Sequence, residues 1–135
     1  IKFFISNKFE IVVPHIKIND GSAKNIVKLI VNEKGKILWM TRSQSPFNFN
    51  SQSIKYLKHL SIIAFNKKSL KNYSSLKMSK YEKIEAVELL MALENEMLVV
   101  SFSIKSDSFS VDILEDFIKA KKFFIKDKIK LNYSK

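Results

Sequence analysis

The chain of 135 residues contains no cysteine, only two glycines and only two prolines. Without cysteine it has no disulfide, no thiolate nucleophile and no cysteine metal ligand, and cysteine usage does not indicate a compartment. Two glycines are few for an enzyme that cradles phosphate groups, because a backbone that approaches a phosphate closely usually needs them. The composition therefore argues against a phosphate-binding loop and against thiol chemistry.

Long hydrophobic runs are also missing. No apolar run approaches the roughly 18 residues that span a membrane, so we expect no transmembrane segment. The opening residues 1–9 have a short apolar core interrupted by polar side chains, which is not typical of a signal peptide. The chain begins with Ile1 rather than Met, which indicates a fragment or a processed product and leaves an upstream anchor open. The sequence does not fix the compartment, and the cytoplasm is the favoured alternative.

The length and the hydrophobic share of 46% are typical of one soluble globular domain, expected to cover residues 1–135. The net charge of +11 is unevenly distributed. Residues 1–80 hold 15 basic and three acidic side chains, residues 82–116 hold nine acidic and two basic ones, and residues 117–135 are basic again. A basic protein attracts polyanions, but the acidic segment argues against a uniform coat of nucleic acid. The acids could equally pair with lysines of the same fold.

Three segments of the first half indicate secondary structure. Residues 9–18 alternate around Pro14, which predicts a strand with an edge or a bulge at the proline. Residues 26–41 predict a β-hairpin, because two apolar strands flank NEKG, whose glycine suits the left-handed position after a type I turn. Trp39 is expected to pack on the sheet as part of the core. Residues 53–70 carry a broad apolar stripe behind two serines that could cap it, which predicts a helix.

The next two segments are less regular. Residues 66–80 are rich in lysine and serine and predict a mobile basic loop. Residues 82–94 fit either a helix followed by one strand or the first arm of a hairpin with the apolar strand that follows. The alternation of Val87, Leu89 and Met91 favours the hairpin.

The C-terminal part predicts one further helix and one further strand. Residues 111–125 begin with acids and end with lysines, which complements the dipole of a helix. Residues 128–133 alternate and predict a final strand. The expected fold class is α+β, a single domain with a mainly antiparallel sheet packed against two main helices.

Few side chains suit catalysis. His15 and His59 stand far apart in the sequence and neither has a helical metal partner four residues away, so His59 is expected to be a packing or surface residue. Glu82, Glu85 and Glu88 would share a face on a helix and diverge on a strand, and capping or solvation is their usual role. There is no phosphate-loop, dinucleotide-binding or EF-hand motif. The sequence therefore predicts no enzyme, no cofactor and no metal.

The order of a hairpin, a helix, further strands and a terminal helix is similar to that of roadblock and longin modules, the profilin-like group of small scaffolds. The residues that carry the resemblance are NIVKLIVNEKGKILWMTRS, the expected helix at 53–70, ENEMLVVSFSI as an inner strand, and the expected helix at 111–125. Sensory folds of the PAS-like type share the hairpin pattern, and roadblock domains begin with a helix where this chain has strands. The resemblance implies a non-catalytic platform that dimerises or seats a partner.

The function predicted from the sequence is a non-enzymatic protein–protein interaction or scaffold module, a subunit of a larger assembly, with a protein partner or a second copy. One alternative is weak, sequence-nonspecific nucleic-acid binding, because a single arginine leaves almost no means of reading bases. Another is a sensory or extracytoplasmic domain of an anchored protein. Phe47 and Phe49 either anchor a partner or pack into the core. The full set of candidate partner-binding residues is Phe47, Phe49, Lys67, Lys68, Lys71, Tyr73 and Lys77.

Overall fold

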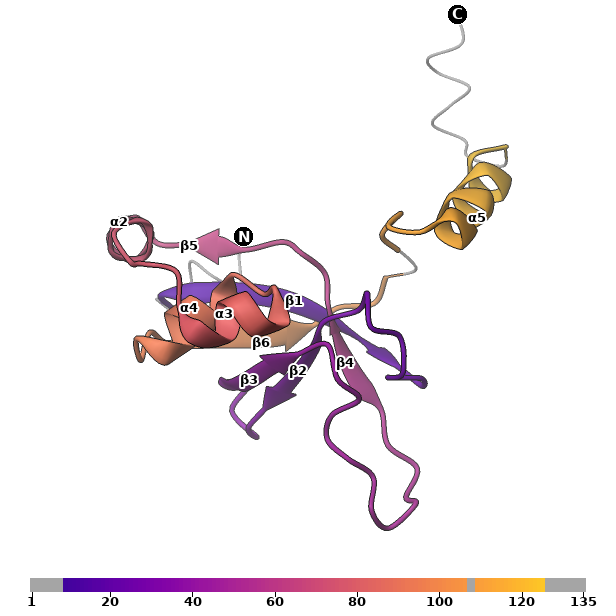
Figure 1. The fold of residues 1–135 in the computed structure, drawn as a ribbon, viewed down its shortest axis with the longest axis horizontal. Helices are drawn as coiled ribbons and strands as arrows, with labels where there is room; N and C mark the ends of the chain where they lie inside the picture. Colours follow the sequence, from indigo (N-terminus) through magenta and orange to yellow (C-terminus); the bar gives the residue numbers. More distant parts are fainter. Residues whose placement is uncertain (1–8, 107–108, 126–135) are drawn as a thin grey trace, which may run out of the picture. The chain divides into compact units, whose positions relative to one another are not determined.

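The computed structural model describes residues 9–106 and 109–125, and the chain divides into two compact units, Ile1–Lys105 and Ser106–Lys135. In its described residues the first unit contains a six-stranded sheet and three short helices, and the second contains one helix (Figure 1). The strand predicted at 128–133 lies outside the described residues.

The sheet is mixed. Its strands are β1 (Ile11–Ile18), β2 (Lys28–Val31), β3 (Ile37–Thr41), β4 (Tyr56–His59), β5 (Ala64–Phe65) and β6 (Val99–Ser103). The order is β3-β2-β4-β1-β5, and β6 lies on the opposite edge of β1, because β5 and β6 both pair with Ile11 and Val12. The β1–β6 pair is parallel and the other pairs are antiparallel. The α+β class is confirmed, whereas the mainly antiparallel sheet is wrong, because β6 returns alongside the central strand in the same direction.

The strand predicted around Pro14 is confirmed as β1, but it is central and not at an edge. The carbonyl oxygen of Pro14 accepts a hydrogen bond from Leu60 N at 3.4 Å, so the ring nitrogen faces the same side. On that side of β1, the pairing with β5 ends at Val12 and the pairing with β4 begins at His15. The missing N–H of Pro14 therefore falls in the gap between two partner strands, where no ladder bond is lost.

The hairpin predicted at 26–41 is confirmed as β2 and β3. Asn32 Oδ1 accepts hydrogen bonds from Lys34 N and Lys36 N, and Gly35 N donates to Asn32 O at 3.0 Å. Gly35 has a φ of 80°, the left-handed conformation that glycine adopts without strain. Ser101 N donates to Gly35 O at 2.8 Å, so the hairpin tip closes onto β6.

The helix predicted at 53–70 is wrong. That segment forms β4 and β5, and the helix α2 (Lys67–Ser74) begins only after Asn66, whose side chain accepts from Ser69 N at 2.8 Å. Between the two strands Ser61 has a φ of 55°, which interrupts any helix. The apolar stripe was misleading because the same residues suit a strand pair that docks on β1.

Within the mobile basic loop predicted at 66–80, α2 forms a helix over Lys67–Ser74, so an irregular loop there is wrong, and the mobility of the segment stays a prediction. The favoured hairpin at 82–94 is wrong as well, and the alternative of a helix followed by one strand is correct. The segment forms α3 (Lys80–Glu85) and α4 (Leu89–Glu94), and then β6. Ser79 and Glu82 make a capping box at the start of α3, and Ala86, with a φ of 49°, ends it.

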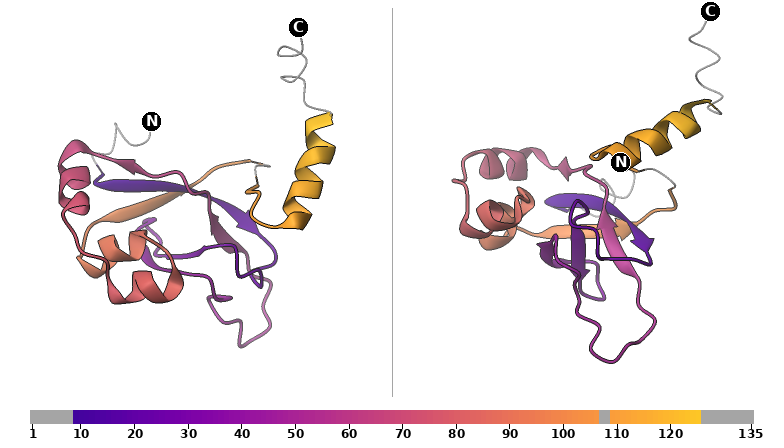
Figure 2. Two further views of the ribbon diagram at one scale, coloured as in Figure 1. Left: turned by 45° about the horizontal axis from the view of Figure 1, so that its top comes forward. Right: turned by 45° about the vertical axis from the view of Figure 1, so that its right-hand side comes forward.

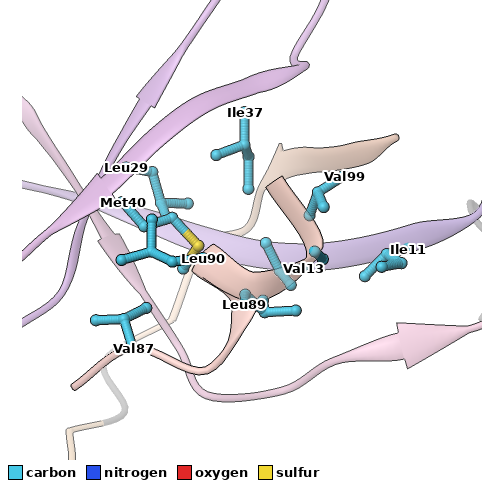
Figure 3. Close-up of a cluster of buried hydrophobic side chains, with 10 residues drawn as sticks. Ile11, Val13, Leu29, Ile37, Met40, Val87, Leu89, Leu90 and Val99 are labelled. Carbon is cyan, nitrogen blue, oxygen red and sulfur yellow. The ribbon is translucent and has the colours of Figure 1, made fainter. Parts of the chain in front are cut away.

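The core of the first unit lies between α4 and the sheet (Figure 3). Figure 2 shows α3 and α4 together beside the strands. Leu90 and Ala92 of α4 and Met40 of β3 are completely buried. Trp39 is half-buried against this cluster and meets the Tyr81 ring edge-on at 5.0 Å, so its expected packing on the sheet is confirmed in part.

The second unit contains α5 (Leu114–Ile125), which confirms the helix predicted at 111–125 with a later start. Glu115 and Asp116 stand in its first turn and Lys122 in its last, the expected complement to the helix dipole. None of the helices in the described part of the chain is long and apolar enough to cross a membrane.

Candidate functional site

A cavity of about 430 Å³ opens in the first unit where the ends of β3 and β4 meet the junction between α3 and α4. Its volume falls in the range of small-molecule sites. Three ionisable side chains line the cavity: Arg42, His59 and Glu88. Apolar side chains form much of the remaining wall: Val27, Met40, Ile63, Val87 and Leu89. An apolar cavity with a few polar groups is the usual form of a ligand site.

His59, which lines this cavity, has an unused hydrogen-bonding atom. Its Nε2 is buried and has no hydrogen-bond partner among the described residues. Burial lowers the pKa of His59, and the nearby Glu88 opposes this only in part. The imidazole is therefore neutral near pH 7, and its buried Nε2 keeps an unused hydrogen-bonding position in a side chain that lines the cavity.

His15 lies beside His59 in the cross-strand register of β1 and β4. Its Nδ1 is 2.6 Å from Ser101 Oγ, which itself donates to Val13 O at 3.0 Å. Because the Ser101 hydroxyl hydrogen is used in that bond, the hydrogen between the two side chains belongs to His15 Nδ1. His15 is thus a satisfied core residue, whereas His59 is not.

Arg42, the only arginine of the chain, holds three segments together at the cavity edge. Its Nε donates to Glu85 O at 2.9 Å and its Nη2 donates to Ala86 O at 3.0 Å. Its Nη1 donates to Asn25 O at 3.3 Å and, less closely, to Lys24 O at 3.5 Å. All three guanidinium nitrogens donate within the described residues, which leaves the second N–H of Nη2 and the positive charge for a ligand.

Two residues in strained backbone conformations line the same cavity. Ser61 has a φ of 55° and Ala86 a φ of 49°, a region that costs a residue with a Cβ about 1–2 kcal/mol. Such strain persists where the surrounding structure imposes it, and it is common at binding sites. The strain marks this cavity as the strongest candidate for a functional site.

The three glutamates that recur every third residue take three different roles. Glu82 completes the capping box of α3, Glu85 bonds to the end of β3, and Glu88 lines the cavity. They do not form one cluster, because the left-handed Ala86 lies between Glu85 and Glu88 and turns the chain. Within residues 9–106 and 109–125, no three histidine, aspartate or glutamate side chains are grouped to hold a metal ion.

The predicted partner-binding residues lie elsewhere. Phe47 and Phe49 are 82% and 84% exposed, on the loop between β3 and β4 that projects away from the sheet (Figures 1 and 2), so they do not pack into the core. Tyr73 is half-buried on Phe65 and donates to Glu88 O at 3.1 Å. Four further members of the set are exposed: Lys67, Lys68, Lys71 and Lys77. Binding of a protein partner through these residues stays a prediction.

The comparisons with known proteins identify the family. The model of the cytidylyltransferase family matches residues 11–105, which run from the first residue of β1 to just beyond β6. This range covers more than half of the chain and includes the whole lining of the cavity. The chain belongs to the cytidylyltransferase family.

The similar proteins of known name agree with one another. The 3-deoxy-manno-octulosonate cytidylyltransferase of Rickettsia rickettsii (strain Sheila Smith) is 33% identical over 126 residues, which are 92% of this chain and 51% of the relative. The protein of that name in Thermodesulfovibrio yellowstonii is 36% identical over 113 residues, 78% of this chain and 44% of the relative. The chain spans about half the length of these relatives.

A solved structure has the same fold. It is that of a CMP:2-keto-3-deoxy-manno-octonic acid synthetase complexed with CTP. It superposes with a TM-score of 0.84 at 23% identity, over 93% of this chain and 53% of that one. At this identity the likeness establishes the fold.

These findings correct the functional predictions made from the sequence. The resemblance to roadblock and longin scaffolds is wrong, because the family model and the matching fold are those of cytidylyltransferases. The non-enzymatic scaffold, the nucleic-acid binder and the sensory domain are not supported, and the prediction that the protein is no enzyme is wrong. Arg42 and His59 are not among the site residues predicted from the sequence. The feature of the sequence that could have indicated the site is its only arginine, which directly follows an apolar strand.

Proposed function

We propose that this chain forms the sugar-acid-binding part of a 3-deoxy-manno-octulosonate cytidylyltransferase. Such an enzyme joins an oxygen of the sugar acid to the α-phosphorus of CTP and releases pyrophosphate. The observation that carries the proposal is the cavity at Arg42, His59 and Glu88, which lies within the segment matched by the family model.

The chemistry of the cavity suits an acidic sugar better than a triphosphate. The remaining N–H of Arg42 and its charge would face the carboxylate of the sugar. The unused Nε2 of His59 and the carboxylate of Glu88 would bond to hydroxyl groups. Glu88 would repel a triphosphate, and with only two glycines the chain has little means of cradling one. We therefore propose that the CTP phosphates bind the part of the enzyme that this chain does not match.

The test uses His59, because its two roles predict changes of opposite sign. His59→Leu removes a buried polar atom that has no partner, so the free protein should keep its stability or gain up to about 1 kcal/mol. The same change should weaken binding of 3-deoxy-manno-octulosonate by about tenfold, as expected for the loss of one hydrogen bond to a hydroxyl group of the ligand. Calorimetric titration and thermal unfolding measure the two effects.

The control is Lys24→Met, which removes an exposed charge near the cavity whose side chain makes none of the contacts described above. It should change neither quantity. Unaltered affinity in folded His59→Leu protein, or no binding of the sugar acid by the wild-type chain, would contradict the proposed function.

A further inference from the structure

A second group of charged side chains, outside the lining of the cavity, bonds to the end of β3 at Thr41 and Arg42. Lys28 is completely buried, at 0% exposure. Its ammonium group donates to Ala23 O and Ile26 O, each at 2.9 Å, and to Arg42 O. All three N–H groups are therefore used, and Lys28 has none left for a ligand.

The guanidinium of Arg42 completes the same arrangement. The carbonyl oxygens of four successive residues, 23–26, accept hydrogen bonds from Lys28 or Arg42. Two cations thus tie the turn before β2 to the end of β3. Because Arg42 also bonds to the carbonyls of Glu85 and Ala86, the end of α3 is fixed to the same point.

Glu85 fixes the main chain at Arg42 from the other side. Its Oε1 accepts from Thr41 Oγ1 at 2.7 Å and its Oε2 accepts from Arg42 N at 2.8 Å. Burial lowers the pKa of Lys28, and the charge of Glu85 is the largest influence that opposes this lowering. The two side chains therefore stabilise one junction by geometry and by charge.

We infer that Lys28 and Glu85 are positioning residues for the binding of an acidic sugar in the cavity. They hold Arg42 and the strained Ala86 in place before the ligand arrives, so that binding does not have to order them. Neither side chain is among those that line the cavity. The inference rests on the proposed function, because it takes Arg42 as the group that meets the carboxylate.

The single arginine makes the inference measurable. A ¹⁵N spectrum contains one arginine Nε–H resonance, that of Arg42, and its hydrogen exchange reports the bond to Glu85 O. In Glu85→Gln and Lys28→Met this exchange should become faster, and the affinity for 3-deoxy-manno-octulosonate should fall by about tenfold. Glu85→Gln is the milder change, because the amide keeps one of the two accepting oxygens and nearly the same shape.

Three matched variants separate positioning from general stability. Glu94→Gln and Lys24→Met make the same chemical changes at exposed side chains and should alter neither readout. Gly35→Ala strains the hairpin tip, outside the cavity lining, and should lower stability without changing the affinity. An affinity loss in Gly35→Ala as large as that in Glu85→Gln would overturn the inference.

The remaining outcomes are also decisive. Folded Glu85→Gln protein with unaltered Arg42 exchange and unaltered affinity overturns the inference while the proposed function stands. If Lys28→Met does not fold, Glu85→Gln alone decides. If the wild-type chain does not bind the sugar acid, the proposed function fails and the positioning role fails with it.

Discussion

The charge state of His59 links pH to both stability and binding. Burial holds its pKa below the ordinary value of 6.5, and that of His15 is lowered by burial and by Lys17. Below pH 6.5 the unfolded chain therefore binds more protons than the folded one, so the free energy of unfolding decreases as the pH falls towards the folded pKa values. Above pH 6.5 this contribution to stability is fully present.

A bound carboxylate should reverse the effect at the ligand site. The negative charge would raise the pKa of His59, so binding would take up protons and the affinity for the sugar acid should increase as the pH falls below 6.5. NMR titration of the two histidines, with and without 3-deoxy-manno-octulosonate, measures both pKa values. A pKa of His59 above 6.5 in the free protein, or one that the sugar acid leaves unchanged, would refute this account.

The strain at Ala86 predicts a stabilising substitution. Ala86 ends α3 in the left-handed conformation, where glycine has no Cβ to strain, so Ala86→Gly should raise the free energy of unfolding by about 1 kcal/mol. The matched change Ala92→Gly, inside α4 and completely buried, should lower it by at least about 1 kcal/mol. Urea unfolding of both variants gives the signs, and equal signs would refute the strain.

At the level of single residues, the sequence shows which chemically distinctive side chains are present but not which of them lie together in the folded chain. It showed that Arg42 is the only arginine and His59 one of two histidines. It did not show that they share a cavity, because their proximity depends on β4. The apolar stripe of that segment predicts a helix instead. The orphaned Nε2 of His59 and the left-handed Ala86 are properties of the folded chain alone.

Among the elements, local chemistry predicted the hairpin well and the helices poorly. The segment NEKG specifies its own turn, because Asn32 and Gly35 satisfy the turn geometry without distant partners. Residues 53–70 and 82–94 have patterns that suit both a helix and a strand, and their packing decides between them. The sequence does not indicate that α3 ends at Ala86, since alanine ordinarily continues a helix.

The hairpin tip yields the prediction at this level. A Cβ on Gly35 would lie 2.8 Å from Ser101 O, and the φ of 80° disfavours a β-branched side chain. Gly35→Val should therefore lower the free energy of unfolding by at least about 2 kcal/mol, from strain and from the lost contact with β6. Lys34→Val, exposed in the same turn, should change it by less than about 0.5 kcal/mol. Equal melting temperatures for Gly35→Val and the wild type would contradict the role of Gly35.

For the whole molecule, the sequence predicted the α+β class but not the sheet order. The parallel pairing of β1 with β6 joins residues nearly 90 positions apart, and no local pattern encodes it. The family was missed for a related reason. The absence of phosphate-binding motifs does not exclude an enzyme, because the chain spans only about half of its named relatives.

The proposal that the sugar acid binds this chain and CTP binds the rest of the enzyme leads to the last prediction. Assayed by itself, the 135-residue chain should bind 3-deoxy-manno-octulosonate and release no pyrophosphate from CTP. Addition of the part of the Rickettsia rickettsii relative that this chain does not match should bring pyrophosphate release that depends on the sugar acid. His59→Leu should reduce this rate about tenfold at low sugar-acid concentration, while Phe47→Ala, on the projecting loop, should leave it unchanged. Pyrophosphate release by the chain alone would show that it carries the CTP site as well.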